Sequence, residues 1–289
     1  MTTPAGKPPV VLNALWWLFQ SLSIPALRRR FFGMKHLLLV LVPSIILANP
    51  AFTQNRNPVT NKLSNELAKE TSSLNPQYLV FLPKQKLKEK IPLIIYLHGA
   101  GGVGDNIQKI KGQAGQVVRG IEKHKKNPAI VVAPQASKKN RQAGGWIPAH
   151  LNILLKHLKE TLQVDEKRIY LTGNSMGGYG SWSWGGHNPE HFAAIAPVSG
   201  GIGPNGPKDV TPSLDKWANN LAKVPVHAFA GGKDRVVPAE RSERMIAAIQ
   251  KAGGKEAKIK IYPNEGHGAG RIIFSSAEFY QWMFSKKRP

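Results

Sequence analysis

The amino-acid sequence predicts an α/β fold, in which a single domain carries a mostly parallel central sheet with helices on both faces. From residue 76 onward, short apolar runs rich in β-branched residues alternate with longer amphipathic runs, an alternation typical of parallel sheets. The short runs are apolar at nearly every position, as expected of strands covered on both faces. No internal repeat or break in composition divides residues 76–289.

These runs place the individual elements. The apolar runs predict strands at 78–82, 92–97, 129–133, 168–172, 192–198, 224–230 and 258–262. The amphipathic runs predict helices at 106–124, 148–163, 175–187, 238–252 and 276–285. Gly253-Gly254 marks the end of the fourth helix. Functional groups on such a sheet lie at the carboxyl ends of the strands, so the residues that directly follow each strand are the first candidates for a site.

The region before this domain contains a predicted secretory signal. Residues 36–48 form an apolar run of signal-peptide length that follows Met34-Lys35, and Ala51-Phe52-Thr53 makes a cleavage site before Gln54. We interpret the chain as an upstream extension or long n-region at 1–33, a signal peptide at 34–53, a polar linker at 54–75 and the folded domain at 76–289. The expected localisation is secreted or periplasmic. The alternative is a membrane anchor formed by an uncleaved N-terminal segment.

Composition limits the possible chemistry and favours certain partners. The chain has no cysteine, which excludes disulfides, Cys-ligated metals and a cysteine nucleophile. Forty Lys and Arg residues against 17 Asp and Glu residues give a net charge of +23. Only five of the basic residues and none of the acidic ones precede residue 54, so the rest of the chain carries +18. This charge favours association with anionic surfaces, although it is equally compatible with a solvated basic surface that has no dedicated ligand.

A candidate nucleophile lies directly after one predicted strand. Gly173-Asn174-Ser175-Met176-Gly177 has the form G-x-S-x-G, stands after the 168–172 strand and opens the 175–187 helix. This strand–turn–helix context places the serine on a tight elbow, and the glycines let backbone segments approach closely. The helix N-terminus favours developing negative charge at Ser175. The alternative is a glycine-rich turn in which Ser175 only caps the helix.

A base and an acid follow two later strands. A serine hydroxyl needs a base, and His267 stands in a glycine-flanked loop after the 258–262 strand. Asp234 follows the 224–230 strand and would orient the imidazolium. Glu265 is a competitor, but it lies in the same loop as His267 and is poorly placed to brace the ring. The chain order Ser175, Asp234, His267 is that of α/β-hydrolases.

The sequence also predicts an oxyanion hole. Acyl transfer passes through a tetrahedral oxyanion that two backbone N–H groups commonly hold, each contributing about 3–4 kcal/mol. Met176, directly after the nucleophile, would supply one N–H group. The loop His98-Gly99-Ala100-Gly101-Gly102 follows the 92–97 strand and would supply the other from Ala100, or alternatively from Gly101.

Several motifs together resemble a known family. They are LHGAGG, the pair Asp105-Asn106, Ala133-Pro134-Gln135, Trp146, RIYLTGNSMGGYGSW, FAAIAPVSGG, GGKDRVVP and NEGH. The set is similar to the bacterial predicted peptidase/phospholipase–carboxylesterase group of the α/β-hydrolase superfamily, near feruloyl esterases, acetyl xylan esterases and polyhydroxybutyrate depolymerases, over about residues 76–289. The resemblance implies an α/β-hydrolase with the triad Ser175, Asp234 and His267. Asn174 departs from it, because a small or apolar residue is expected there.

The expected function is therefore a secreted serine esterase that acts on a small-molecule or polysaccharide-linked ester, with no cofactor and no metal. One alternative is a serine peptidase of the prolyl-oligopeptidase type, and another is a non-catalytic binder of anionic cell-envelope polymer. No nucleic-acid-binding motif is visible. Asn174 and Trp146 are the candidate pocket residues, and Trp146 could instead be a rim aromatic that caps the next helix.

Overall fold

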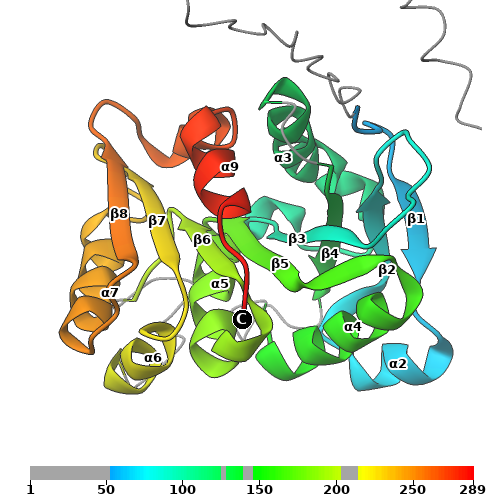
Figure 1. Ribbon diagram of the computed structural model, residues 1–289, viewed down its shortest axis with the longest axis horizontal. Helices are drawn as coiled ribbons and strands as arrows, with labels where there is room; N and C mark the ends of the chain where they lie inside the picture. The colour runs from blue at the N-terminus through cyan, green and yellow to red at the C-terminus, as the bar shows by residue number, and fades with distance from the viewer. Residues whose placement is uncertain (1–52, 125–127, 139–145, 203–213) are drawn as a thin grey trace, which may run out of the picture. The chain divides into compact units, whose positions relative to one another are not determined.

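The computed structural model describes residues 53–124, 128–138, 146–202 and 214–289, which contain one eight-stranded sheet with the order β1-β2-β4-β3-β5-β6-β7-β8 (Figure 1). Only β2 runs against the other strands, because it pairs antiparallel with both β1 and β4. The strands are β1 (Val59–Lys62), β2 (Leu74–Phe81), β3 (Ile91–Leu97), β4 (Ile130–Ala136), β5 (Val164–Asn174), β6 (Ala194–Val198), β7 (Val226–Gly231) and β8 (Ala257–Tyr262). The predicted α/β class with a mostly parallel sheet is confirmed.

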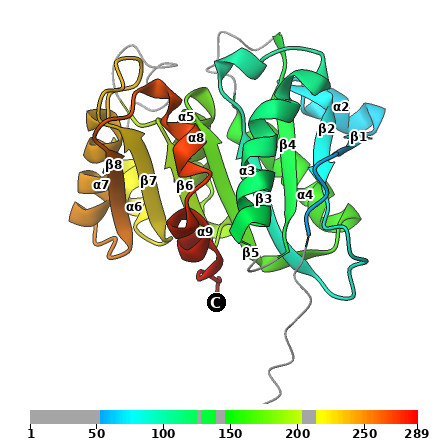
Figure 2. The same cartoon turned by 90° about the horizontal axis from the view of Figure 1, so that it is seen from above.

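Helices cover both faces of this sheet. They are α2 (Asn65–Glu70), α3 (Lys111–His124), α4 (Pro148–Thr161), α5 (Met176–His187), α6 (Leu214–Leu221), α7 (Glu240–Lys251), α8 (Gly270–Ile273) and α9 (Ala277–Phe284). Alternate residues of β3 enter different cores. Leu93 and Ile95 belong to the core that also contains side chains of α4, α5, α6 and α7, whereas Ile94 and Tyr96 belong to the core that contains side chains of α3 and α9. Figure 2 shows α3 and α9 on the same face of the sheet.

Each strand and helix predicted from residue 76 onward is present, with ends that differ by a few residues. The helix expected at 106–124 begins as a 3₁₀ turn, Ile107–Ile110, before α3. Helices α6 and α8 have no counterpart among the predicted elements. The expected signal peptide at 34–53 lies outside the described residues except for Thr53, and the extension at 1–33 lies outside them altogether. Within the described part of the chain, no helix combines the length and apolar character that crossing a membrane requires.

The prediction of a polar linker at 54–75 is wrong. This stretch contains β1 and α2 and leads into β2. Val59 pairs with Val80 across the ladder, and the Ser64 hydroxyl caps α2 by accepting the N–H of Leu67 at 3.3 Å. An edge strand that is exposed on both faces needs no apolar run, so β1 has the composition of a loop.

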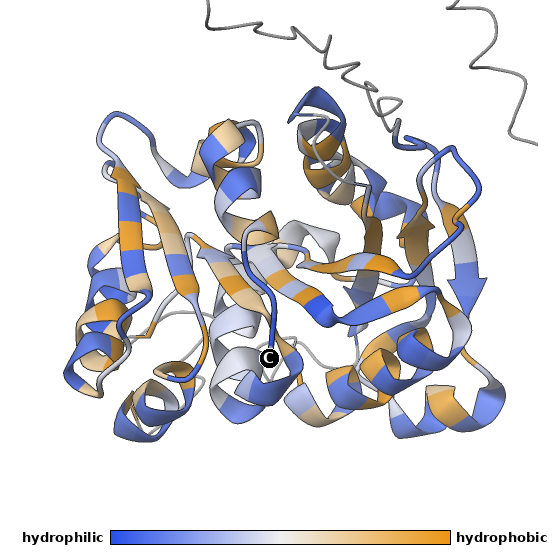
Figure 3. Ribbon diagram, viewed as in Figure 1, coloured by the Kyte–Doolittle hydropathy of each residue, from blue (hydrophilic) through white to orange (hydrophobic). Residues whose placement is uncertain are grey.

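The turn from β5 into α5 is packed too tightly for side chains. A Cβ atom on Gly177 would lie 1.8 Å from the carbonyl oxygen of Leu97 in β3, and one on Gly173 would lie 2.4 Å from the carbonyl oxygen of Gly177. Between them Ser175 has φ 58° and ψ −117°, a conformation that costs about 1–3 kcal/mol in a residue other than glycine. The pale colour of α5 in Figure 3 reflects the glycine, serine and tryptophan residues that dominate this buried helix.

Replacing Gly177 by alanine should therefore prevent this packing. Gly112 is the matched control, because both glycines are the second residue of their helix and a Cβ atom on Gly112 would meet nothing within 4 Å. We expect Gly177→Ala to destabilise the fold by more than about 3 kcal/mol, and Gly112→Ala to leave it unchanged or stabilise it by up to about 1 kcal/mol. Urea unfolding measures both. Equal stability of the two variants would contradict the close approach of α5 to β3.

A buried histidine in β7 should make stability depend on pH. His227 is 2% exposed and packs against Phe229 and against Trp282 of α9. Burial lowers its pKa from 6.5 to about 4. The ring is thus neutral in the fold but protonates near pH 6.5 in the unfolded chain. The stability that this provides is present above about pH 6.5 and is lost as the pH falls toward about 4.

His227→Leu should reduce this dependence. When the pH falls from about 7 to about 4.5, the free energy of unfolding should decrease in both proteins. The decrease should be about 1 to 2 kcal/mol smaller in the variant than in the wild type, a range that allows for screening of the His227 charge by solvent. Urea unfolding at the two pH values provides the comparison. Identical losses in both proteins would show that His227 does not contribute.

Candidate active site

The site lies where the direction of strand order reverses. The chain passes from β3 to β4 on one side of β3 and then to β5 on the other side. Ligands of open parallel sheets bind beside the carboxyl ends of strands at such a reversal. Ser175 follows β5 here, and the glycine loop follows β3. A Cβ atom on Gly99 would lie 3.6 Å from the Cβ of Ser175, so the loop and the serine are direct neighbours.

The structure brings Ser175, His267 and Asp234 into one hydrogen-bonded chain. The Nε2 atom of His267 lies 2.9 Å from the Ser175 hydroxyl, and its Nδ1 atom lies 2.9 Å from Oδ2 of Asp234. Since a carboxylate can only accept, Nδ1 carries the proton and Nε2 is free to accept the serine proton. The three residues follow β5, β7 and β8, as the sequence predicted.

Asp234 is fixed by its own loop. Its side chain is fully buried, and Oδ1 accepts the N–H groups of Val236 and Val237 at 2.9 and 2.8 Å. Oδ2 therefore remains for His267. The loops after β7 and β8 pack closely, because a Cβ atom on Gly231 would lie 2.5 Å from the carbonyl oxygen of Glu265. The contribution of Glu265 to this arrangement is its backbone carbonyl, which accepts the N–H of Lys233 at 2.8 Å.

The predicted oxyanion donors belong to two segments next to Ser175. Met176 is the first residue of α5, so its N–H has no acceptor within the helix. Ala100 begins a 3₁₀ turn, Ala100–Gly102, directly after Gly99. The neighbouring Gly99 N–H is occupied, since it donates to Oε1 of Gln113 at 3.0 Å. Within the described residues, Ala100 and Gly101 have no such acceptor for their N–H groups.

The two candidate pocket residues have different surroundings. The Asn174 side chain packs against Gly270, the first residue of α8, which directly follows the 3₁₀ turn that begins with His267, and its Oδ1 is buried without a hydrogen-bond partner in the described part of the chain. Trp146 belongs to the hydrophobic core. It is 2% exposed, packs edge-on against His98 at 4.9 Å, and fills the space beside Gly180. The alternative of a rim aromatic is wrong, because the absence of a side chain at Gly180 lets the indole enter the core, and the role of Trp146 in a substrate pocket stays a prediction.

His98 is a part of the site that the sequence did not single out. Its Nδ1 atom lies 2.7 Å from the carbonyl oxygen of Gly99, and its Nε2 accepts the N–H of Ala136 at 2.9 Å. Burial lowers the pKa of His98 to about 4, so the ring is neutral and its tautomer is fixed by these two bonds. The position directly before the glycine loop was the available signal. Gln113 gave none, since a polar residue on an amphipathic helix is ordinary.

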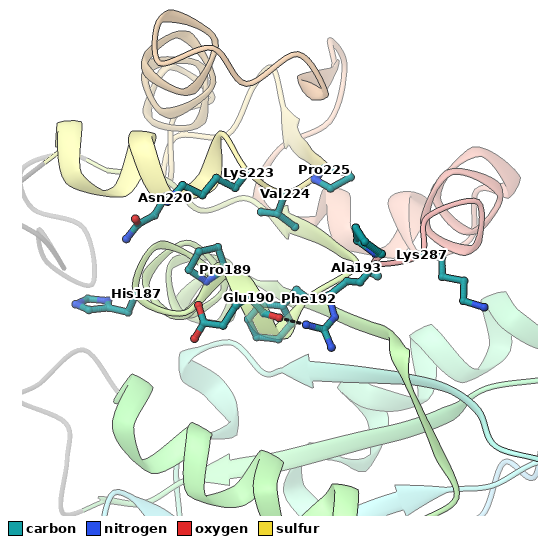
Figure 4. A pocket seen from close by; sticks show the side chains of 12 residues that line it. His187, Pro189, Glu190, Phe192, Ala193, Asn220, Lys223, Val224, Pro225 and Lys287 are labelled. Carbon is teal, nitrogen blue, oxygen red and sulfur yellow. Dashed lines mark hydrogen bonds between the residues drawn. The ribbon is translucent and has the colours of Figure 1, made fainter.

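The described residues show no metal site, and the cavity in Figure 4 lies away from Ser175. No group of three His, Asp or Glu side chains within the described ranges could hold a metal ion. A cavity of about 440 Å³ lies at the amino ends of β6 and β7, next to residues such as His187, Asn220 and Lys223 (Figure 4). This cavity lies at the opposite end of the strands from Ser175, and Ser175, Asp234 and His267 are not among the residues that line it.

Two kinds of known protein are similar to parts of this chain. A protein of Yersinia pestis assigned as a carboxymethylenebutenolidase is 36% identical over 106 residues, which cover 36% of this chain and 38% of that protein. The chain spans less than half the length of several such relatives. A protein of Aspergillus clavatus assigned as feruloyl esterase C is 25% identical over 201 residues, covering 68% of this chain and 69% of that protein.

A solved structure of an esterase is also similar to this chain. A thermostable esterase superposes with a TM-score of 0.62 and 25% identity, over 82% of this chain and 64% of that one. The model of the dienelactone hydrolase family matches residues 77–271. With this match, and with a fold and neighbours of the α/β-hydrolase type, the chain belongs to the dienelactone hydrolase family.

Proposed function

We propose that this chain is a serine hydrolase that cleaves carboxylic esters through an acyl-Ser175 intermediate. The observation that carries the proposal is the continuous chain from the Ser175 hydroxyl through His267 to the buried carboxylate of Asp234, with two hydrogen bonds of 2.9 Å. Membership of a hydrolase family whose relatives include esterases supports the choice of an ester bond.

In the first half of the reaction, His267 Nε2 accepts the proton of Ser175 as Oγ attacks the ester carbonyl carbon. The carbonyl oxygen becomes an oxyanion, which the N–H groups of Met176 and Ala100 would hold. The imidazolium is stabilised by the carboxylate of Asp234. It then gives its proton to the leaving alkoxide, so the alcohol departs as a neutral molecule and the acyl group stays on Ser175.

In the second half, water replaces the alcohol. His267 accepts a proton from the water molecule, whose oxygen attacks the acyl carbon, and a second oxyanion forms in the same place. The bond to Ser175 Oγ then breaks, and His267 returns the proton to the serine. The carboxylic acid leaves, and the site is restored without a cofactor or a metal.

Ser175→Ala tests the nucleophile. With p-nitrophenyl acetate, we expect kcat to fall by at least about 1,000-fold, because the attacking atom is lost. Ser285→Ala is the matched control, since Ser285 is exposed at the end of α9 and its hydroxyl bonds only locally to Trp282. Activity that survives in Ser175→Ala would exclude the assignment.

Two further measurements separate the alternatives in the same preparation. A fluorophosphonate probe should label the wild type and not Ser175→Ala, whereas a non-catalytic polymer binder would stay unlabelled. A p-nitroanilide substrate should turn over far more slowly than the ester, whereas comparable rates would indicate a peptidase. A panel of acetyl, butyryl, feruloyl and hydroxybutyryl esters then identifies the acyl group.

We further propose that the enzyme is exported by the signal at 34–53 and acts outside the cytoplasm, where the net charge of +18 that remains after cleavage favours anionic surfaces. When the full chain is expressed in a secreting bacterial host, intact mass should place the mature N-terminus at Gln54. Leu39→Arg should hold the protein in the cytoplasm, because a charge interrupts the apolar run. Recovery of an uncleaved chain in the membrane fraction would instead support an anchor.

A further inference from the structure

A buried amide in β4 holds the glycine loop from the side opposite to Ser175. Gln135 is 0% exposed. Its Nε2 group donates to the carbonyl oxygen of Gly102 at 2.8 Å and to that of Asn106 at 2.9 Å. A single side chain thus ties two points of the loop that are four residues apart to the middle of the sheet.

A neighbouring amide fixes the direction in which Gln135 points. Asn75 Oδ1 accepts the N–H of Gln77 at 3.0 Å, so the Nδ2 group of Asn75 faces the other way. That group donates to Oε1 of Gln135 at 2.7 Å. Gln135 must therefore turn its oxygen toward Asn75 and both N–H bonds toward the loop. Asn75 lies where the pairing of β2 with β4 shifts between Leu74 and Tyr78, an irregularity that occurs next to many active sites.

Other hydrogen bonds also hold the glycine loop, and none of these hydrogen bonds from outside the loop involves Ala100 or Gly101 in the described part of the chain. Gly99 is bonded at both backbone groups, by Gln113 and His98, and the N–H of Gly104 donates to the carbonyl oxygen of Ala136 at 3.0 Å. The anchors therefore surround Ala100 and Gly101, whose N–H groups are the candidate oxyanion donors. A loop rich in glycine is conformationally free in isolation, so this arrangement has to come from the surroundings.

We propose that Asn75 and Gln135 form a positioning pair that holds the backbone donor of the glycine loop where the oxyanion develops. This inference rests on the proposed function, since it needs an acyl transfer at Ser175. Neither side chain touches the substrate. They act through the loop, because a preorganised donor stabilises the transition state only if it is already in place, and a shift of about 1 Å is enough to lower the rate by about 100-fold.

Two substitutions change the pair in different ways. Gln135→Met keeps the length of the side chain and removes all three hydrogen bonds. Asn75→Asp keeps the acceptor for Gln77, but its carboxylate attracts the amide N–H bonds of Gln135 and turns Oε1 toward the carbonyl oxygens of the loop. Asn75→Asp therefore decides the question if Gln135→Met does not fold.

Asn152 provides a matched control. Its Oδ1 accepts the indole N–H of Trp184 at 2.7 Å, and its Nδ2 donates to Asn188 at 3.0 Å. Asn152→Asp therefore also exchanges an amide donor for a carboxylate within a bridge of side chains. This bridge joins α4 to the far end of α5, away from the glycine loop.

With p-nitrophenyl acetate, kcat should fall by about 10- to 100-fold in Gln135→Met and Asn75→Asp, while KM stays within about threefold. Inhibition by trifluoroacetone, whose adduct with Ser175 places an oxyanion at the same position, should weaken in proportion to kcat/KM. Asn152→Asp should lose a similar amount of thermal stability and keep its kcat and its inhibition constant.

The proposal is overturned if the Asn75 and Gln135 variants lose stability but keep kcat, or if all three variants lose kcat equally. It is also overturned if kcat falls without any change in inhibition by trifluoroacetone. A different result marks failure of the proposed function itself, namely equal activity of wild type and Ser175→Ala on the same ester. The two failures are therefore distinguishable in one set of assays.

Discussion

The site depends on one contact in the backbone, where the first turn of α5 lies against the carboxyl end of β3. The Cβ position of Gly177 falls 1.8 Å from the Leu97 carbonyl oxygen, so only glycine permits this approach. The same approach sets Ser175 at φ 58° and brings it beside the loop that follows β3. Ser175 and the candidate oxyanion donors are thus neighbours, because the backbones of two strands and one helix meet where no side chain intervenes.

The remaining parts of the site are brought in by the order of the strands. Asp234 and His267 follow β7 and β8, which pair in parallel from Val226 with Ala257 to Gly231 with Tyr262. Parallel pairing places both loops at the carboxyl ends of the strands. Gly231 and Gly232 let the backbones of the two loops come into contact. The buried carboxylate then has the imidazole as its remaining partner.

Much of this could be predicted from the sequence, because buried parallel strands are apolar throughout and their carboxyl ends show where reactive residues gather. Ser175, Asp234 and His267 were found in this way, and the structure brings them together. The strand β1 was missed, since an exposed edge strand carries polar residues like a loop. The burial of Trp146 could not be predicted from its neighbours in the chain, because the space that the indole fills lies beside Gly180, 34 residues later. Gln135 was noted only as part of the Ala133-Pro134-Gln135 motif and Asn75 not at all, because their hydrogen bond depends on the register shift between β2 and β4.

The position of β8 has a consequence for how activity is lost. Ser175 follows β5, a strand inside the sheet, whereas His267 follows β8, which is an edge strand and, within the described residues, pairs with β7 alone. Its Lys258 and Lys260 positions alternate with apolar residues, which Figure 3 shows as blue and orange bands. Strands with one neighbour open at a lower free energy than central ones. Local opening of β8, which amide exchange would report, would therefore separate His267 from Ser175 while the core stays folded, so on warming the proposed activity would be lost before the core unfolds.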